Sequence, residues 1–448
     1  MFAQTRERLT SHSVVAARNG NGGVLMANPS VLHNPDHYDP DWFVNRKDEI
    51  RIVKELVGRL RSGGDAPERT ISFDGARGQG KSWLAQHLHR TIFPKLNVKS
   101  LYFAFDSSLE EDPENQGWYL HTWQTKPERT DLNQGMTSAF AADILLDSCI
   151  KLEARHTIDA NLAERAAELV APIRREAERE STGRQLYAFI LDSVSELSSS
   201  FTDILERALL ASVASFPNVL IVMTGRPPFP VWAAPRLRID VIHWVLKPFC
   251  EQDVLSMLSR RNSDNQISLE QVMKKSHGIP GVVRDISLQS GGATKVSLSA
   301  TLNWMLDVFA NPQDRQRARE GIEALCLLKH GFREEEIQKM LSAYSEKEIT
   351  EEDVEALEDL LTKQQLLKWD RESAGLQVDR AIRLVAAQYL YDEQPKLWTR
   401  LHEEAAGMYE EYAAQFRDHR DYYQRIAEHH RQALNNEHSS VDADIQTV

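Results

Sequence analysis

The chain has 448 residues, of which 42% are hydrophobic and 27% charged, and its formal net charge is −13 at pH 7. This length allows more than one domain, with at least one sizeable core. No apolar run approaches the roughly 18–20 residues that span a bilayer, residues 1–30 lack the apolar core of a secretory signal, and the acidic balance removes the usual signature of a nucleic-acid-binding surface.

Three cysteines occur, at Cys149, Cys250 and Cys326. Their spacing is typical neither of a disulfide framework nor of a zinc site. We therefore expect a protein of the reducing cytoplasm with no membrane association.

The first elements in chain order follow a leader of residues 1–35, which is polar, lacks a period and is expected to be flexible. Residues 46–63 have the apolar spacing of an amphipathic helix. Residues 69–92 indicate a strand, a loop and a helix, and "VKSLYFAF" (98–105) indicates a buried strand. A polar insert at 106–130 is expected to be a surface loop, within which the aromatic "WYLHTW" (118–123) is a candidate for docking a partner.

The middle of the chain alternates between helices and apolar strands. Helices are expected near 136–154, 161–180 and 201–216, and strands at 186–192, 218–225 and 238–246. Continuous apolar strands that alternate with helices indicate a parallel sheet with helices on both faces.

After Pro248 the chain turns helical. Three short amphipathic helices (251–261, 268–276 and 280–290) precede longer ones, and "LKWDRESAGLQVDR" (367–380) reads as two short strands around a Ser-Ala-Gly turn. Helices followed by a small hairpin favour a winged-helix module. Two further amphipathic helices follow, at 397–416 and 421–434.

The most informative motif lies between the first strand and its helix. "GARGQGKS" fits G-x-x-x-x-G-K-[ST], a loop whose backbone N–H groups cradle phosphates. Lys81 is expected to pair with the β- and γ-phosphates of ATP or ADP and the Ser82 hydroxyl to ligate Mg²⁺. The predicted nucleotide-binding residues here are Gly75, Ala76, Arg77, Gly78, Gln79, Gly80, Lys81, Ser82 and Trp83.

Charged residues at the ends of two later strands complete this site. Asp192 ends an apolar strand and is expected to hold the metal together with Ser82. Ser193 stands where many ATPases have a catalytic glutamate, so Glu196 is the candidate to orient the attacking water. Arg226, after the strand "NVLIVMTG", is placed to sense the γ-phosphate.

Together these motifs resemble the signal-transduction ATPases with numerous domains, the STAND class. "FVNRKDEI" (43–50) is similar to the segment that lies against the adenine in that class, which implies contacts from Val44 and Arg46. "LDSVSEL" and "MTGRPP" are similar to its metal-binding and sensor strands. "HGIPGVV" is similar to the glycine-x-proline motif of its lid, so the resemblance implies that Pro280 packs on the base.

The fold class expected is α/β, a P-loop NTPase sheet with helices on both faces, followed by helical modules. The expected divisions are a flexible segment (1–35), a P-loop ATPase domain (36–247), a helical lid (248–295), a winged-helix domain (296–392), a C-terminal helical segment (393–436) and a flexible tail (437–448).

This chain departs from the STAND pattern in two ways. A His-Asp pair of the winged helix often contacts ADP in that class, and the nearest match here is Val378-Asp379, without the histidine. The chain also has no room for full effector and sensor domains. The resemblance therefore implies an ATPase switch that forms nucleotide-dependent homo-oligomers and works with a separate effector or sensor protein, in bacterial defence or signalling.

Two alternatives stay open. An origin-recognition-type loader would bind DNA through its winged helix and use Arg284 as a lid arginine, although the acidic charge and Ser193 do not favour it. A nucleotide-clamped scaffold with negligible turnover is the other, because the acid after Asp192 is missing.

Overall fold

The computed structural model describes most of the chain between residues 38 and 435. The described ranges are 38–62, 68–105, 118–121, 160–179, 184–197, 202–203, 205–227, 229–260, 268–289, 297–309, 311–370 and 374–435. The leader, the helix expected at 136–154 and the tail from 437 lie outside these ranges.

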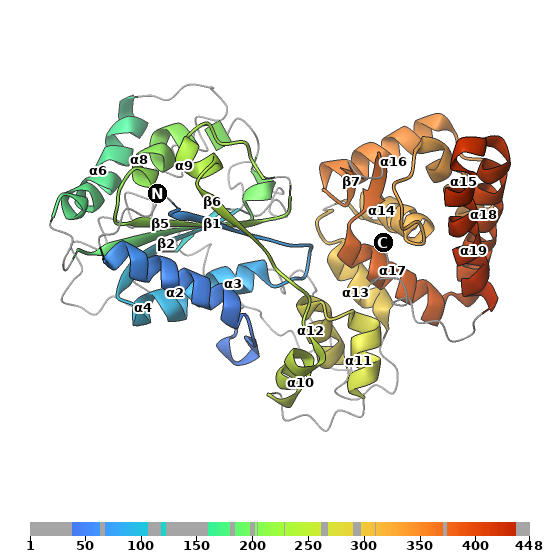
Figure 1. Cartoon of the computed structure of the whole chain (residues 1–448), viewed down its shortest axis with the longest axis horizontal. Coiled ribbons are helices and arrows are strands. Elements are labelled where there is room, and N and C mark those ends of the chain that lie inside the picture. Colours follow the sequence, from blue (N-terminus) through green and yellow to red (C-terminus); the bar gives the residue numbers. More distant parts are fainter. Residues whose placement is uncertain are drawn as a thin grey trace, which may run out of the picture.

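A six-stranded sheet in the order β3-β2-β4-β5-β1-β6 forms the centre of the N-terminal half (Figure 1). Neighbouring strands are parallel except at the β2–β3 edge, where the pairing is antiparallel. The strands are β1 (Thr70–Asp74), β2 (Val98–Phe105), β3 (Trp118–His121), β4 (Leu186–Asp192), β5 (Val219–Gly225) and β6 (Val241–Val245). The expected parallel sheet is confirmed.

Helices cover both faces of this sheet (Figure 1). We call the sheet and these helices together the α/β part (residues 38–246). The helices on one face are α2 (Lys47–Arg61), α3 (Lys81–His87) and α4 (Phe93–Lys95), and those on the other are α6 (Ala160–Ala177), α8 (Ala211–Ala214) and α9 (Pro235–Arg238). Alternate residues of each strand supply the two cores: Phe73 and Ile190 face the α2 side, while Phe189 and Ile221 face the α6 side.

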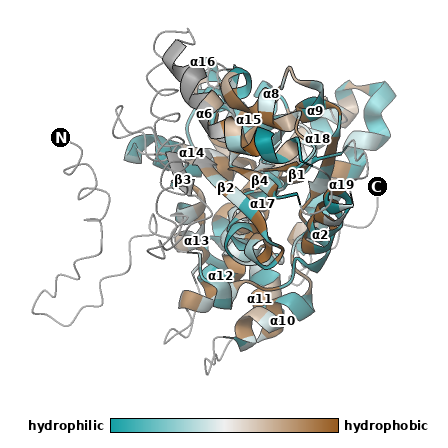
Figure 2. Ribbon diagram, turned by 90° about the vertical axis from the view of Figure 1, so that its left-hand side faces the viewer, coloured by the Kyte–Doolittle hydropathy of each residue, from teal (hydrophilic) through white to brown (hydrophobic). Residues whose placement is uncertain are grey.

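Amphipathic spacing explains how α2 sits on the sheet. Val53, Leu56 and Val57 are buried in the core beneath it, and its polar residues lie on the outer side (Figure 2). Short wide turns, η4 (Leu88–Ile92) and η7 (Glu206–Leu210), interrupt the regular helices on the two faces. The sequence pattern predicts helices at these positions but not their wider winding.

The expectation of a loop throughout residues 106–130 is wrong at one place. Trp118–His121 forms strand β3, paired antiparallel with β2 from Tyr102 to Phe105. Aromatic residues favour extended backbone, and the open edge of β2 offers unpaired backbone groups to them. The proposed docking role of residues 122 and 123 lies outside the described residues.

Helices make up most of the part beyond β6, which we call the helical part (residues 249–435). These are α10 (Glu251–Ser259), α11 (Leu269–Ser276), α12 (Pro280–Gln289), α13 (Leu298–Met305), α14 (Pro312–Leu325), α15 (Glu334–Ser345), α16 (Glu351–Lys363), α17 (Arg380–Glu393), α18 (Pro395–Gln415) and α19 (Arg420–Asn435). One continuous apolar cluster runs through them from Val254 to Ala427.

The expected hairpin is present after α16. Strands β7 (Leu367–Asp370) and β8 (Gly375–Val378) pair antiparallel, with Leu367 opposite Val378. The hairpin follows α14, α15 and α16 along the chain, and Phe332 after α14 bridges to Leu376 of β8.

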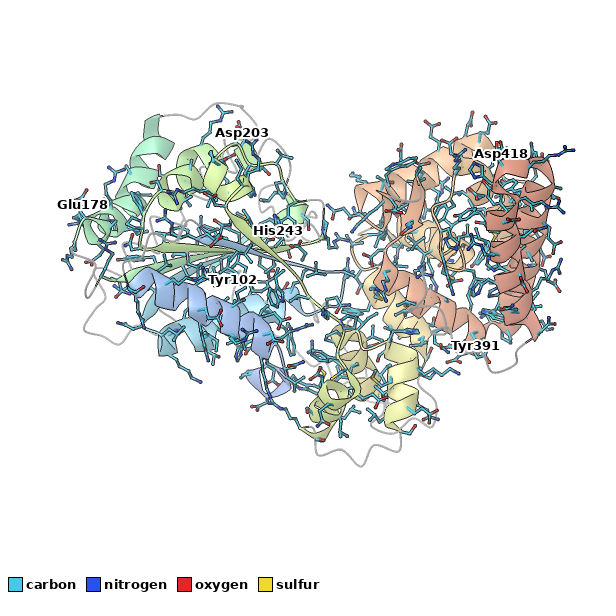
Figure 3. The ribbon with its side chains drawn as sticks, viewed as in Figure 1. Tyr102, Glu178, Asp203, His243, Tyr391 and Asp418 are labelled. Atoms are coloured by element: carbon cyan, nitrogen blue, oxygen red, sulfur yellow. The ribbon has the colours of Figure 1, made fainter. Side chains whose placement is uncertain are left out.

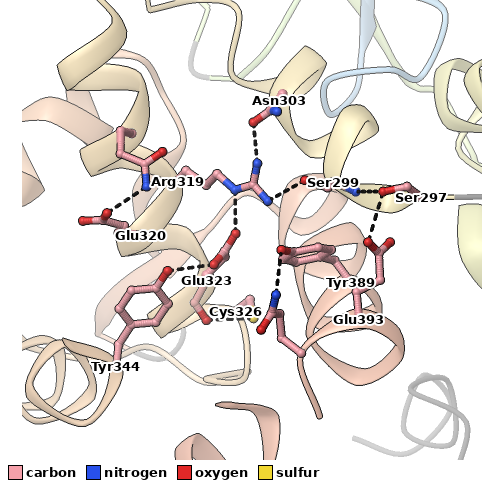
Figure 4. A network of polar contacts seen from close by, with 12 residues as sticks. Ser297, Ser299, Asn303, Arg319, Glu320, Glu323, Cys326, Tyr344, Tyr389 and Glu393 are labelled. Atoms are coloured by element: carbon pink, nitrogen blue, oxygen red, sulfur yellow. Dashed lines mark hydrogen bonds and ion pairs between the residues drawn. The ribbon is translucent and has the colours of Figure 1, made fainter. Parts of the chain in front are cut away.

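A polar network joins four helices of the helical part (Figure 4). Arg319 of α14 pairs with Glu323 at 2.7 Å, donates to Asn303 Oδ1 at 2.6 Å and lies 5.1 Å from the ring centroid of Tyr389. Tyr344 of α15 donates to the other Glu323 oxygen at 2.9 Å. Because both members of the ion pair are largely buried and hydrogen-bonded, the network fixes α13, α14, α15 and α17 relative to one another.

No described helix combines the length and the apolar composition needed to cross a membrane.

The last two helices enclose a pair of histidines. Nδ1 of His402 in α18 lies 2.8 Å from Nδ1 of His430 in α19, and both rings are buried. One imidazole must donate and the other accept. Burial lowers the pKa of both groups from the ordinary value of 6.5.

We expect the helix pair α18–α19 to lose stability in acid. Folding keeps both imidazoles neutral, whereas the unfolded chain binds protons below 6.5, so this contribution is complete above that pH and lost as the pH falls. Each histidine that stays neutral adds a slope of up to about 1.4 kcal/mol per pH unit. Hydrogen exchange in α18 and α19 should be faster at about pH 5.5 than at about pH 7.5 after correction for intrinsic rates. His430→Phe should reduce this difference, the exposed control His419→Gln should not, and equal protection at both pH values would contradict the prediction.

Candidate nucleotide-binding site

The glycine-rich loop connects the end of β1 to the start of α3. Gly78 and Gly80 both have φ of +82°, a left-handed backbone that a side chain would strain. The parallel strands end at this same edge of the sheet, and α3 begins there at Lys81. This is the strand–loop–helix context that the phosphate-binding interpretation requires.

Lys81 is the lysine of the loop. Its ammonium donates to the carbonyl oxygens of Gly75 at 2.7 Å and Ala76 at 2.9 Å. Burial lowers the pKa of Lys81 to about 7, with Arg226 adding to the effect and the carboxylates of Asp379 and Asp192 opposing it. A cation held by two neutral carbonyls gains most from an anionic partner, which suits a phosphate.

A pair of oxygen groups beside Lys81 fits a hard divalent cation. Ser82 Oγ donates to Asp192 Oδ1 at 3.1 Å, and Asp192 ends the neighbouring strand β4. Burial raises the pKa of this carboxyl group, an effect that hydroxyl donors and Lys81 oppose. A hydroxyl and a carboxylate at this place are the donor set that P-loop proteins use for Mg²⁺, so the residues present fit the metal.

The turn that follows Asp192 carries the predicted catalytic acid. Ser193 adopts a left-handed backbone with φ of 63°, and Val194–Glu196 forms the 3₁₀ turn η6. The backbone of Glu196 therefore lies at the same edge as the P-loop. Its side chain is outside the described part of the structure, and its role stays a prediction.

Arg226 follows β5 and is only 5% exposed to solvent. Its Nη1 donates to the backbone oxygen of Gln364 at 2.9 Å, and its charge acts on Lys81. Arg226 therefore lies near Lys81 and also contacts the helical part, which the sequence did not indicate. Its role as a γ-phosphate sensor stays a prediction.

Arg46 contacts the loop from its N-terminal side. It donates to the backbone oxygens of Gln79 at 2.6 Å and Lys247 at 2.8 Å, and its guanidinium lies 5.1 Å from the ring centroid of Phe249. Val44, two residues earlier, is buried. Arg46 thus braces the loop against the beginning of the helical part, and its direct contact with a base stays a prediction.

The first helices of the helical part cover the loop. Gly281 N–H donates to the Gly78 oxygen at 2.8 Å, and a Cβ on Gly281 would lie 2.6 Å from Trp304 Cη2. Pro280 begins α12 and is buried next to Gly80. Trp83 lies under the Arg284 guanidinium, 4.8 Å from ring centroid to Cζ.

Three contacts at this site had no signal in the sequence. Tyr102, within the apolar strand β2, donates to Asp192 Oδ2 at 2.5 Å, and Thr224 donates to Asp192 Oδ1. Gln365 Nε2 donates to the Ser195 carbonyl oxygen at 3.1 Å. Each depends on pairing of segments far apart in the chain, which local patterns do not report.

The sheet order and the site define a class. A P-loop follows β1, strand β5 lies between β1 and β4, and Asp192, the predicted metal ligand, ends β4. The fold is that of an AAA-related P-loop ATPase.

Three solved structures show distant similarity to this chain. A Walker-type ATPase of Pyrococcus abyssi is 16% identical with a TM-score of 0.45 over 78% of this chain and 97% of that one. The Orc1 protein of Aeropyrum pernix, solved in complex with DNA, is 15% identical with a TM-score of 0.38 over 82% and 97%. A STAND protein with a tetratricopeptide repeat sensor from Pyrococcus horikoshii is 13% identical with a TM-score of 0.31 over 88% and 54%.

At these identities and TM-scores the similarities assign no function to this chain. No protein-family model matches the chain, and no curated protein matches it.

We expect Lys81→Ala to abolish nucleotide binding. Loss of the loop's ammonium removes the charged donor expected to pair with the β- and γ-phosphates, which weakens binding about 100-fold or more. Titration of a fluorescent ADP analogue measures this, with the exposed Lys95→Ala on α4 as the control. Wild-type affinity in Lys81→Ala would show that the nucleotide site is elsewhere.

Proposed function

We propose that this protein is an ATP-binding and ATP-hydrolysing molecular switch of the STAND type. Its nucleotide state would control how the helical part rests on the α/β part, and through that the formation of homo-oligomers and the control of a separate effector or sensor protein. The resemblance of the motifs to the STAND class favours a role in bacterial defence or signalling in the cytoplasm.

The turn between α16 and β7 carries this proposal, because it contacts the α/β part through two hydrogen bonds. The turn between α16 and β7 presents the Gln364 carbonyl to Arg226, while the Gln365 side chain bonds to Ser195 in the turn after the metal-binding strand. The residues that would read the γ-phosphate are therefore held by the segment that would have to move. Such a contact favours one state of a two-state system and can be exchanged for another.

The hairpin that follows this turn adds a second link. Asp379, after β8, caps α17 by accepting from the Ala381 N–H at 3.1 Å, and its carboxylate favours the charged form of Lys81. Lys368 of β7 lies 3.9 Å from the same carboxylate. This supports a resting state in which Asp379 is close to the phosphate loop even though the histidine of the STAND His-Asp pair is replaced by Val378.

The chain's own residues would divide the work as follows. The loop from Gly75 to Gly80 and Lys81 would hold the phosphates, Ser82 and Asp192 would hold Mg²⁺, and Glu196 would orient the water. When bound, Mg²⁺ neutralises charge on the phosphates. In the ATP state Arg226 would donate to a phosphate oxygen instead of the Gln364 carbonyl, which would free the helical part. With Ser193 in place of an acid, we expect slow, regulatory turnover.

The divisions between modules belong to the same proposal. Residues 36–247 would form the ATPase domain, 248–295 the lid, 296–392 a winged-helix domain and 393–436 a C-terminal helical segment. The order α14, α15, α16, β7, β8 supports the winged-helix assignment, in which α16 would take the place of the recognition helix.

The charge of α16 weighs against DNA binding by an origin-recognition-type loader. Its exposed acidic residues are Glu351, Glu352, Asp353, Glu355 and Asp359, with one lysine, Lys363, in the last turn. Such a surface repels the phosphate backbone that supplies most of the affinity for DNA. The nucleotide switch therefore remains the favoured function.

We expect Glu196→Gln to bind ATP but to hydrolyse it about 100-fold or more slowly, because the amide cannot accept a proton from water. Retained ATP should enrich oligomers, so phosphate release and light scattering after gel filtration are measured together. The exposed Glu178→Gln at the end of α6 (labelled in Figure 3) is the matched control. Unchanged hydrolysis would remove Glu196 from the catalytic role, and unchanged monomer content with ATP retained would contradict the switch.

A further inference from the structure

Tyr102 is a buried polar side chain that the proposed mechanism has not used. It lies in β2, on the face of the sheet covered by α2, α3 and α4, and has 0% exposure (Figure 3). Its hydroxyl donates to Asp192 Oδ2 at 2.5 Å. A tyrosine hydroxyl in an apolar core needs such a partner, but the partner here is the carboxylate that would hold the metal.

The register of the sheet explains how the two groups meet. β2 and β4 are parallel neighbours, with Tyr102 opposite Ile190 and Ala104 opposite Asp192. Asp192 lies two residues after Ile190, so its side chain is on the same face of the sheet as that of Tyr102. The tyrosine ring reaches along this face towards the carboxyl end of β4.

The two oxygens of Asp192 have different partners. Oδ2 accepts from Tyr102, while Oδ1 accepts from Ser82 at 3.1 Å and from Thr224. Thr224 is itself held, because its Oγ1 accepts from the Ser193 N–H at 3.1 Å. The carboxylate therefore cannot rotate without breaking a buried hydrogen bond, and Oδ1 stays directed at Ser82, the other predicted metal ligand.

We propose that Tyr102 is a positioning residue that orients Asp192 for Mg²⁺. This rests on the proposed function, since it assumes that Ser82 and Asp192 hold the metal of a bound nucleotide. The hydroxyl of Tyr102 is bonded to the carboxylate of Asp192, so we infer that it acts through this residue. Partners of metal ligands in other proteins contribute about 10–100-fold to metal affinity.

If Tyr102 had only a structural role in the core, a different result would be expected. A tyrosine that only fills space and satisfies its hydroxyl would change thermal stability and leave metal affinity as it is. A positioning residue changes the Mg²⁺ dependence of nucleotide binding and leaves the metal-free affinity as it is.

The test is Tyr102→Phe, which keeps the ring and removes the hydroxyl. Binding of a fluorescent ADP analogue is measured in EDTA and then across a Mg²⁺ titration. We expect wild-type affinity in EDTA and an apparent Mg²⁺ affinity about 10–100-fold weaker. Tyr187→Phe is the matched control, because Tyr187 is buried at the opposite end of β4; its Mg²⁺ titration should match the wild type.

The outcomes separate the two proposals. If Mg²⁺ has no effect on nucleotide binding by the wild type, the metal site of the proposed function is wrong. If the wild type depends on Mg²⁺ and Tyr102→Phe has the same Mg²⁺ titration, the positioning role is wrong and the proposed function stands. Should Tyr102→Phe fail to fold, Tyr102→Met also lacks the hydroxyl and adapts its shape to the core, and it must show the same weakening.

Discussion

The bond between Arg226 and the Gln364 carbonyl is the interaction on which the proposed switch depends. A guanidinium that is 5% exposed must have acceptors, since burying it without them is costly. In this structure one acceptor is a backbone oxygen of the helical part. A phosphate oxygen of a nucleotide bound at the loop would be an acceptor of higher charge. The same arginine can therefore stabilise two arrangements of the chain.

Rigid packing on each side of this contact determines what can move. The apolar cluster from Val254 to Ala427 is continuous, and the Arg319–Glu323 network ties four of its helices together (Figure 4). The cover of the loop by α12 is close enough that Gly281 has no room for a side chain. A change at the phosphate loop is therefore expected to displace whole groups of helices, because packed cores are not continuously deformable.

Local patterns in the sequence predict much of this fold. The apolar runs at β1, β4 and β5 and the glycines of the loop are specified by their own residues, and the structure has them where they were expected. β3 was missed because it is a short aromatic segment within a polar insert, and only its pairing with β2 shows that it is a strand. Tyr102 was missed because a tyrosine in an apolar run looks like any core residue, and Gln365 because its partner is 170 positions away. The contacts that distinguish this site are long-range and are not written in any one segment.

The measurement that tests the switch most directly is hydrogen exchange at residues 362–367, in the turn that holds Arg226. It is compared in protein saturated with ADP and with a non-hydrolysable ATP analogue. The account predicts slow exchange with ADP and clearly faster exchange with the ATP analogue, since the Gln364 and Gln365 contacts would be released. Equal exchange in the two states would contradict it.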